Sequence, residues 1–274
     1  MMRPRVQGPP PTRIPHQTMT DFDLSLGYVA LLIGTGFAAG IINTLAGGGT
    51  NLTLPALMVM GIPAEFANAT NRVGVLLQSI VALFGFRKHD RLPTDDVGPI
   101  LLPTIVGGIF GAIAAAYAPS GLLKPLLLGA MLGMTTIILV KPDVIAPPPN
   151  TVPFRVRDRP ASWFWLWLAG FYGGFVQAGV GFILITALAG SLRYDLVRTN
   201  ALKMVCVCAF TAMALAVFIA QGLVLWVPGL ILAVGTMAGA NTAVRFAITA
   251  KPSTLKWFLF AMTLCGTVAA LLSD

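Results

Sequence analysis

The chain has 274 residues, of which 56% are hydrophobic and only 10% are charged. Because soluble domains carry about 25% charged residues, this composition excludes a soluble protein. It predicts an all-α polytopic membrane protein with room for about eight transmembrane helices of roughly 20 residues each. The net charge of +8 does not indicate nucleic-acid binding, because most of the cations lie in the connections between apolar runs, as membrane orientation requires.

The first half of the chain begins with a polar, Pro-rich tail, residues 1–23, which we predict to be disordered rather than a removed signal peptide. A first membrane unit follows over residues 24–140. Its apolar runs predict spans at 24–46, 68–86, 97–117 and 122–140. A further apolar piece, 52–60, is too short to cross a membrane alone, so we expect a half-helix or a re-entrant arm.

A basic, Pro-rich linker, residues 141–162, divides the molecule, and a second membrane unit covers residues 163–274. The expected spans are 163–188, 197–220, 223–248 and 253–272. Trp163, Trp165 and Trp167 are typical of an interfacial aromatic belt. When every span is counted as a crossing, most basic connections fall on the side of the two termini. The positive-inside rule then places both termini in the cytoplasm, at the inner face of the cell membrane.

The two halves share a series of features in the same order, which indicates an internal repeat. The matching segments are Gly36-Phe37-x-x-Gly40 and Gly170-Phe171-x-x-Gly174, the glycine breaks Gly47-Gly48-Gly49 and Gly179-Val180-Gly181, the acid-bearing turns at Glu65 and Asp195, and the helix starts Thr70-Asn71 and Thr199-Asn200. Interrupted apolar segments at matching positions point to a transporter binding site. If each half has four spans, the two four-helix repeats point the same way and their pseudo-twofold axis runs along the membrane normal.

Several apolar runs carry pairs of glycines four residues apart. The pairs are Gly36 and Gly40, Gly107 and Gly111, Gly129 and Gly133, Gly170 and Gly174, and Gly235 and Gly239. Such small-x-x-x-small patterns usually mark close helix packing, so we predict packing contacts at each. The triple glycine at Gly47 is different, because consecutive glycines unwind a helix.

The unwound segments predict an anion site, because free backbone N–H groups at a new helix start attract negative charge. Arg72 and Lys203 follow the two helix starts and enter apolar runs, where a cation usually faces a cavity or a partner. Snorkelling to the membrane surface is the alternative for both. The predicted substrate-binding residues are Asn43, Gly47, Gly48, Gly49, Thr50, Asn51, Thr70, Asn71, Arg72, Gln177, Gly179, Gly181, Thr199, Asn200 and Lys203.

Acids and metal-binding side chains are scarce near the breaks. Glu65 and Asp195 are the candidates for proton coupling, with turn capping as the structural alternative. Cys206 and Cys208 lie two residues apart and point about 200° apart on a helix, so they cannot share a metal ion. The sequence contains no His-Glu-x-x-His motif and no phosphate-binding loop. We therefore expect no catalytic residue, metal or cofactor, and no enzyme activity.

With these motifs in hand, the sequence resembles the sulfite exporter TauE/SafE family of membrane transporters. The resemblance rests on residues 36–51, Pro55-Ala56-Leu57 with Gly61-Ile62-Pro63, residues 67–71, and the second copy from Gly170 to Asn200. It covers nearly all of residues 24–272. The family implies a duplicated four-plus-four helical bundle that moves sulfite, sulfonates or related organic acids, often outward. This chain departs by its long tail and by Ala187, which stands where the first copy has Pro55.

Three functions remain open at this point. The first is a secondary transporter, in the exporting direction, for small anions across the cytoplasmic membrane. The second is a passive anion channel, and the third is a membrane accessory or assembly protein that transports nothing. The expected partners are a small anionic substrate and the lipid bilayer, and homo-oligomerisation is left open.

Overall fold

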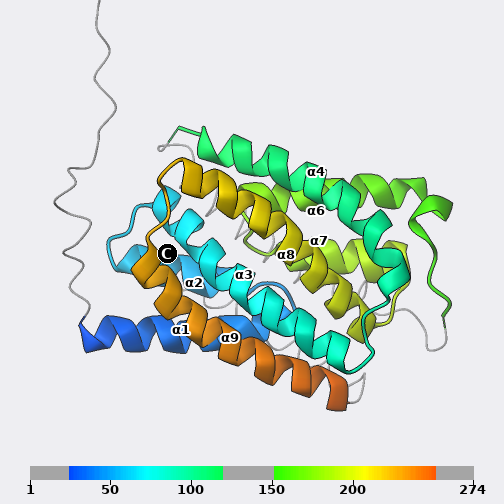
Figure 1. The fold of residues 1–274 in the computed structure, drawn as a ribbon, viewed down its shortest axis with the longest axis horizontal. Coiled ribbons are helices and arrows are strands. Elements are labelled where there is room, and N and C mark those ends of the chain that lie inside the picture. Colours follow the sequence, from blue (N-terminus) through cyan, green and yellow to red (C-terminus); the bar gives the residue numbers. More distant parts are fainter. Residues whose placement is uncertain (1–24, 120–150, 251–274) are drawn as a thin grey trace, which may run out of the picture.

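The computed structural model describes residues 25–119 and 151–250, and in these ranges the chain forms eight α-helices and no strand (Figure 1). The prediction of an all-α protein is confirmed. Five helices are long and apolar enough to cross a membrane. They are α1 (Leu26–Leu45), α3 (Ala64–Lys88), α4 (Val97–Ala116), α8 (Leu196–Ala220) and α9 (Trp226–Thr249). The tail, the predicted spans 122–140 and 253–272, and the start of the linker lie outside the described ranges.

Both predicted breaks interrupt helices. The first separates α1 from α2 (Thr50–Val59), and the second separates α6 (Pro160–Phe175) from α7 (Val180–Ile185), which continues into the π-helical turn η5 (Thr186–Ser191). Gly47 and Gly179 take φ angles of 98° and 73°, which glycine adopts at little cost. Residues 163–188 are therefore two short helices rather than one continuous span.

The predicted glycine pairs bring four helices together in two close pairs. The contacts place Gly36 against Leu232 and Gly40 against Thr236, and Gly107 against Trp167 and Gly111 against Phe171. At each site the glycine faces a backbone carbonyl of the partner helix, so a larger residue would separate the helices. In each pair of helices, the contact made by the later glycine is with a later residue of the partner helix. The helix α1 therefore runs parallel to α9, and α4 runs parallel to α6. The pair at Gly129 and Gly133 lies outside the described residues.

Hydrogen bonds at both ends of α4 and α8 show that these two helices run in the same direction. After the last turn of α8, Gln221 Nε2 donates to the Tyr117 hydroxyl at the end of α4, at 3.2 Å. At the other end, the Tyr194 hydroxyl donates to Asp96 Oδ2 at 2.5 Å, and these residues directly precede α8 and α4. The two helices therefore begin at one end of the bundle and end at the other.

The helices α3 and α9 begin close together, at the end of the bundle opposite to the starts of α4 and α8. The backbone N–H of Leu225, which precedes α9, donates to Thr70 Oγ1 in α3 at 3.0 Å. Because a short connection with η2 (Thr94–Asp96) joins α3 to α4, those two helices run in opposite directions. It follows that α1 runs opposite to α6 and α3 runs opposite to α8, as Figure 1 shows.

These opposite directions contradict the expectation that the matching segments point the same way. The reason lies in α1 and α2, which form a hairpin. α2 has ten residues and is about 15 Å long, half the thickness of a bilayer core. It leads back to the end of the bundle where α1 began, and α3 starts there (Figure 1). Counting 24–46 and 68–86 as successive crossings predicts opposite directions for α1 and α3, whereas both helices run parallel to α9.

The described cations outside the core gather at one end of the bundle, where α4, α6 and α8 begin. They are Arg87, Lys88, Arg91, Arg155, Arg157, Arg159, Arg193, Arg198 and Arg245. At the opposite end, where α1, α3 and α9 begin, the described residues include no Lys or Arg, and Glu65 is the charged residue there. Over the ranges that the structure describes, the two ends of the bundle therefore differ strongly in charge.

Candidate functional site

The two glycine breaks meet in the interior of the bundle. Gly47 and Gly181 are in backbone contact, and a Cβ added to either would overlap the Cα of the other. Both are buried, and Gly48 lies under the ring of Phe182. The breaks therefore form one region, built from both halves of the chain, rather than two separate irregular segments.

Arg72 lies in α3, after the first break, and reaches the end of the helix before the second break. Its Nη1 donates to the carbonyl of Gly173 at 2.5 Å and its Nη2 to that of Gly174 at 2.9 Å. Both carbonyls belong to the last turn of α6, where the helix dipole is negative, so the cation stabilises that terminus. Arg72 has no exposed surface and packs against the ring of Phe218.

Lys203 makes the reciprocal contact. It lies in α8, after the second break, and its Nζ donates to the carbonyl of Thr44 at 2.9 Å, in the last turn of α1. A second bond, also 2.9 Å, goes to Oδ1 of Asn200. Lys203 is fully buried as well. Each cation thus follows one break in sequence and holds the helix that precedes the other.

Neither buried cation has an acid as partner among the described residues. The ion pairs found in these ranges join Arg157 to Asp158 and Arg198 to Asp195, and all four side chains are more than half exposed. Backbone carbonyls offset only part of the cost of burying a full charge. The region around the breaks is therefore electropositive, as an anion site requires.

Amide side chains surround the two cations and are partly paired with one another. Thr53 Oγ1 donates to Asn71 Oδ1 at 2.7 Å, and Asn68 Nδ2 donates to the carbonyl of Phe175 at 3.2 Å. Gln177, held at a φ of 66°, donates from Nε2 to Thr211 Oγ1 at 2.9 Å. These bonds orient the amides and leave Nδ2 of Asn71 and Oε1 of Gln177 without a partner among the described residues, while Oδ1 of Asn68 accepts from Arg72 Nη2 at 3.4 Å.

An unusual number of buried polar atoms here have no hydrogen-bond partner within the described ranges. They are Thr44 Oγ1, Thr50 Oγ1, Asn51 Oδ1, Asn71 Nδ2, Arg72 Nε, both amide atoms of Gln78, Gln177 Oε1 and Asn200 Nδ2. Buried polar atoms in folded proteins are nearly always paired with protein or water. A cluster of free donors and acceptors beside two buried cations is what a site for a polar, negatively charged ligand needs.

Other predicted residues have structural roles. Thr70 accepts the bond from Leu225, and the Thr199 hydroxyl donates to the carbonyl of Tyr194 at 3.2 Å. Asn43 is buried in the last turn of α1, and Gly49 packs on the carbonyl of Ala39. Asn43 and Gly49 thus lie at the first break, and Thr70 and Thr199 hold the segments that precede α9 and α8. The unpaired polar atoms belong to the residues next to them in sequence, Thr44, Thr50, Asn71 and Asn200.

The two predicted coupling acids lie away from this cluster, at opposite ends of the bundle. Asp195 is the N-cap of α8, where its Oδ1 accepts from the N–H groups of Val197 and Arg198 at 3.0 Å. Glu65 lies in the first turn of α3 and is half-buried. The capping contact of Asp195 matches the structural alternative considered for it.

The predicted set of substrate-binding residues omits five polar residues of this region, Thr44, Thr53, Asn68, Gln78 and Thr211. Thr44 supplies the carbonyl for Lys203, Thr211 holds Gln177, and Gln78 is buried with a free amide. The spacing in the sequence could have identified Gln78. It follows Asn71 by seven residues, which is two helical turns, and therefore lies on the same face of α3.

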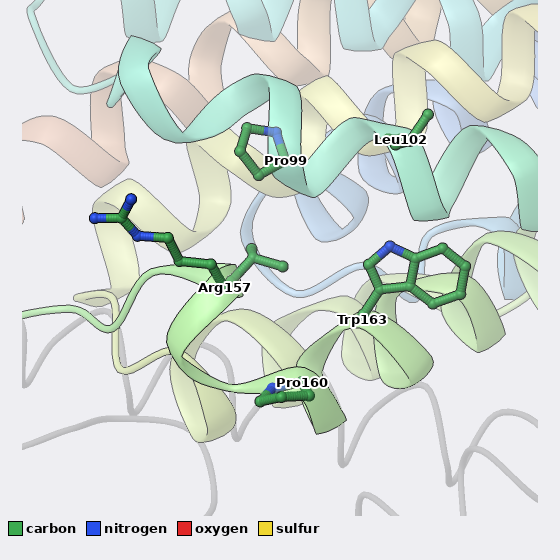
Figure 2. Close-up of a pocket in the computed structure, with 6 residues that line it drawn as sticks. Pro99, Leu102, Arg157, Pro160 and Trp163 are labelled. Atoms are coloured by element: carbon green, nitrogen blue, oxygen red, sulfur yellow. The ribbon is translucent and has the colours of Figure 1, made fainter.

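A cavity of about 560 Å³ lies elsewhere, between the N-terminal parts of α4 and α6 (Figure 2). Its lining consists of Pro99, Leu102, Val156, Arg157, Pro160 and Trp163. None of the predicted site residues contributes to it, and its surface is largely apolar apart from Arg157. We therefore place the candidate site at the breaks and not in this open cavity.

Comparisons with known proteins agree with a transport function. A model of the family described as "Sulfite exporter TauE/SafE" matches residues 32–270. The "Probable membrane transporter protein ORF9" of a Sinorhizobium species is 25% identical over 249 residues, which cover 91% of this chain and 94% of that protein. A "Probable membrane transporter protein" of Haemophilus influenzae is 24% identical, covering 89% and 95%. The "Probable membrane transporter protein YfcA" of Escherichia coli K12 is 27% identical, covering 82% and 80%. No solved structure matches the chain.

Proposed function

Because the chain belongs to the sulfite exporter TauE/SafE family, we propose that it is a secondary transporter that exports sulfite, sulfonates or related small organic anions across the cytoplasmic membrane. That it is a multi-pass membrane protein of a transporter family follows from the family match and from its five long apolar helices. The substrate class and the outward direction are our proposal.

The observation that carries the proposal is the reciprocal placement of Arg72 and Lys203. Two fully buried cations, one from each half of the chain, bind the last turns of the two helices that lead into the breaks, and the breaks themselves meet at Gly47 and Gly181. Free donor atoms on Asn71, Asn200 and Arg72 accompany them. An anion bound here would supply the negative charge and the hydrogen-bond acceptors that the described protein groups do not.

The same geometry suggests how the site is opened to either side. We infer two inverted repeats, with α1 to α4 in the first and α6 to α9 in the second, related by an axis in the membrane plane. Carriers with such repeats move one part of the molecule against another around a central site. Arg72 and Lys203 each connect one repeat to the other, so both would shift their contacts in such a movement.

The orientation in the membrane follows from the charge of the two ends. We place the basic end of the bundle in the cytoplasm by the positive-inside rule. In that orientation α1 begins on the outer side, which differs from the expectation of two cytoplasmic termini. Asp195 then lies at the cytoplasmic end and Glu65 at the outer end, and both stay candidates for proton coupling.

Uptake by proteoliposomes tests the proposal. Purified protein would be supplied with a panel of labelled anions, sulfite, alkanesulfonates and carboxylates, with and without a pH gradient. We expect saturable flux of at least one small oxyanion. Flux that does not saturate and does not depend on a counter-ion would show a channel, and an absence of flux for every anion would favour an accessory protein.

A further inference from the structure

Gln78 is a buried amide with no partner in the part of the chain that the structure describes. It lies near the middle of α3, is 1% exposed, and has neither its Nε2 donor nor its Oε1 acceptor engaged. A primary amide removed from water without hydrogen bonds destabilises the fold. A residue of this kind in the middle of a transmembrane helix calls for a functional explanation.

The position of Gln78 relates it to the break region. Two helical turns separate it from Asn71, about 10 Å along the helix axis, and the two residues share one face of α3. Val75 and Ala82 flank Gln78 on that face. Both belong to a buried cluster that also contains Leu45 and Val180, from the edges of the two breaks.

The fold itself does not need an amide at this position. When Asn71 is aligned with Asn200, its counterpart in the second half, Gln78 aligns with Val207, because each of the two lies seven residues after its asparagine. Val207 is 3% exposed and belongs to the same buried cluster. The helix α8 thus has a buried apolar side chain at this position, whereas α3 has the polar side chain of Gln78.

We propose that Gln78 determines substrate specificity by hydrogen-bonding a substrate group that both donates and accepts, such as the S–OH and S=O of hydrogen sulfite or a hydroxyl of a hydroxyalkanesulfonate. This inference rests on the proposed function and narrows its substrate class. The cations and the free Asn71 donor suit anionic oxygens, which only accept hydrogen bonds. The free Oε1 of Gln78 requires a donor, which a fully ionised sulfonate group does not have.

A matched pair of sulfonates tests this proposal. Ethanesulfonate and 2-hydroxyethanesulfonate differ by one hydroxyl, and each would compete in proteoliposomes against the anion that the wild-type protein transports best. A site built to bind a hydroxyl rejects an analogue that lacks it. We expect the hydroxylated compound to compete at a concentration at least about tenfold lower in the wild type. In Gln78→Leu this preference falls to about threefold or less, while transport continues.

A neighbouring residue provides the control. Ser79 is also fully buried, but its hydroxyl already donates to the carbonyl of Val75 at 2.6 Å. Ser79→Ala should therefore keep the preference. Gln78→Leu should unfold at the same temperature as the wild type or higher, because it replaces a free buried amide with an apolar group.

Three results would overturn the proposal: no preference in the wild type, a full preference in Gln78→Leu, or a lower unfolding temperature of that variant, which would show a structural role. If the wild type carries an anion but has no preference, only the role of Gln78 fails. If the wild type carries no anion at all, the proposed function fails, and the specificity role fails with it.

Discussion

Gly47 and Gly181, from opposite halves of the chain, lie in direct backbone contact where the two broken helices meet. Neither position has room for a Cβ, and Gly47 also has a φ of 98°. The contact joins the break that follows α1 to the start of α7. Carbonyls in the last turns of α1 and α6, the helices that precede the two breaks, are held by Lys203 and Arg72. The geometry of the candidate site therefore depends on these two glycines.

Gly47→Ala should destabilise the protein strongly. The added methyl overlaps the backbone of Gly181 and the residue must keep a left-handed conformation, so we expect a loss of more than about 2 kcal/mol in the free energy of unfolding. Thermal unfolding in detergent measures the effect. Gly34→Ala is the matched control, because nothing lies within 4 Å of a Cβ at Gly34. Equal unfolding temperatures for the two variants would contradict the observed contact.

Tyr194→Phe should weaken the basic end of the bundle, because it removes the hydrogen bond to Asp96. We expect a loss of about 1–3 kcal/mol in the free energy of unfolding. Burial, and then the bond to Asp96, raise the pKa of Tyr194 above its ordinary value. The folded protein therefore disfavours the phenolate, and the stabilisation by Tyr194 is complete below about pH 10 and decreases at higher pH.

Unfolding temperatures measured up to strongly alkaline pH check this prediction. The wild type should lose stability above about pH 10 more steeply than Tyr194→Phe does. Identical slopes would show that Tyr194 does not change its environment on folding.

Thiol labelling should distinguish the two ends of the bundle. Gln221 and His89 are both exposed, at the ends of α8 and α3 respectively. In a background without native cysteines, a membrane-impermeant maleimide should label Gln221→Cys in intact cells, and His89→Cys only after lysis. The reverse pattern would show that the basic end faces outward, against the positive-inside rule.

The sequence predicted the all-α fold and the long helices α1, α3, α4, α8 and α9, because long apolar runs bounded by turns leave few alternatives in a membrane protein. It also located both breaks: the first from its consecutive glycines, which unwind a helix, and the second from its match to the first. It did not predict the directions of the helices. Whether the segment after α1 continues across the membrane or folds back as α2 depends on packing, and hydropathy does not contain that information.

The site was predicted only in part. The sequence brought Asn71, Arg72, Asn200 and Lys203 into the candidate site because polar side chains next to an interrupted helix are rare, and their role in binding stays a prediction. Their exact contacts could not be found, because Arg72 and Lys203 bind backbone carbonyls more than 100 residues away, and a carbonyl has no sequence signature. Gln78 was missed because its significance depends on what surrounds it in the folded chain.

The central claim is that the two buried cations bind the transported anion, and the flux of Arg72→Gln and Lys203→Gln in proteoliposomes tests it most directly. Lys88→Gln is the control, because Lys88 is exposed at the end of α3. Both site variants should insert and remain folded, and each should lose at least about tenfold in flux, because losing a buried charge from a binding site costs 2 kcal/mol or more. Lys88→Gln should transport like the wild type. Wild-type flux in both site variants would contradict the claim.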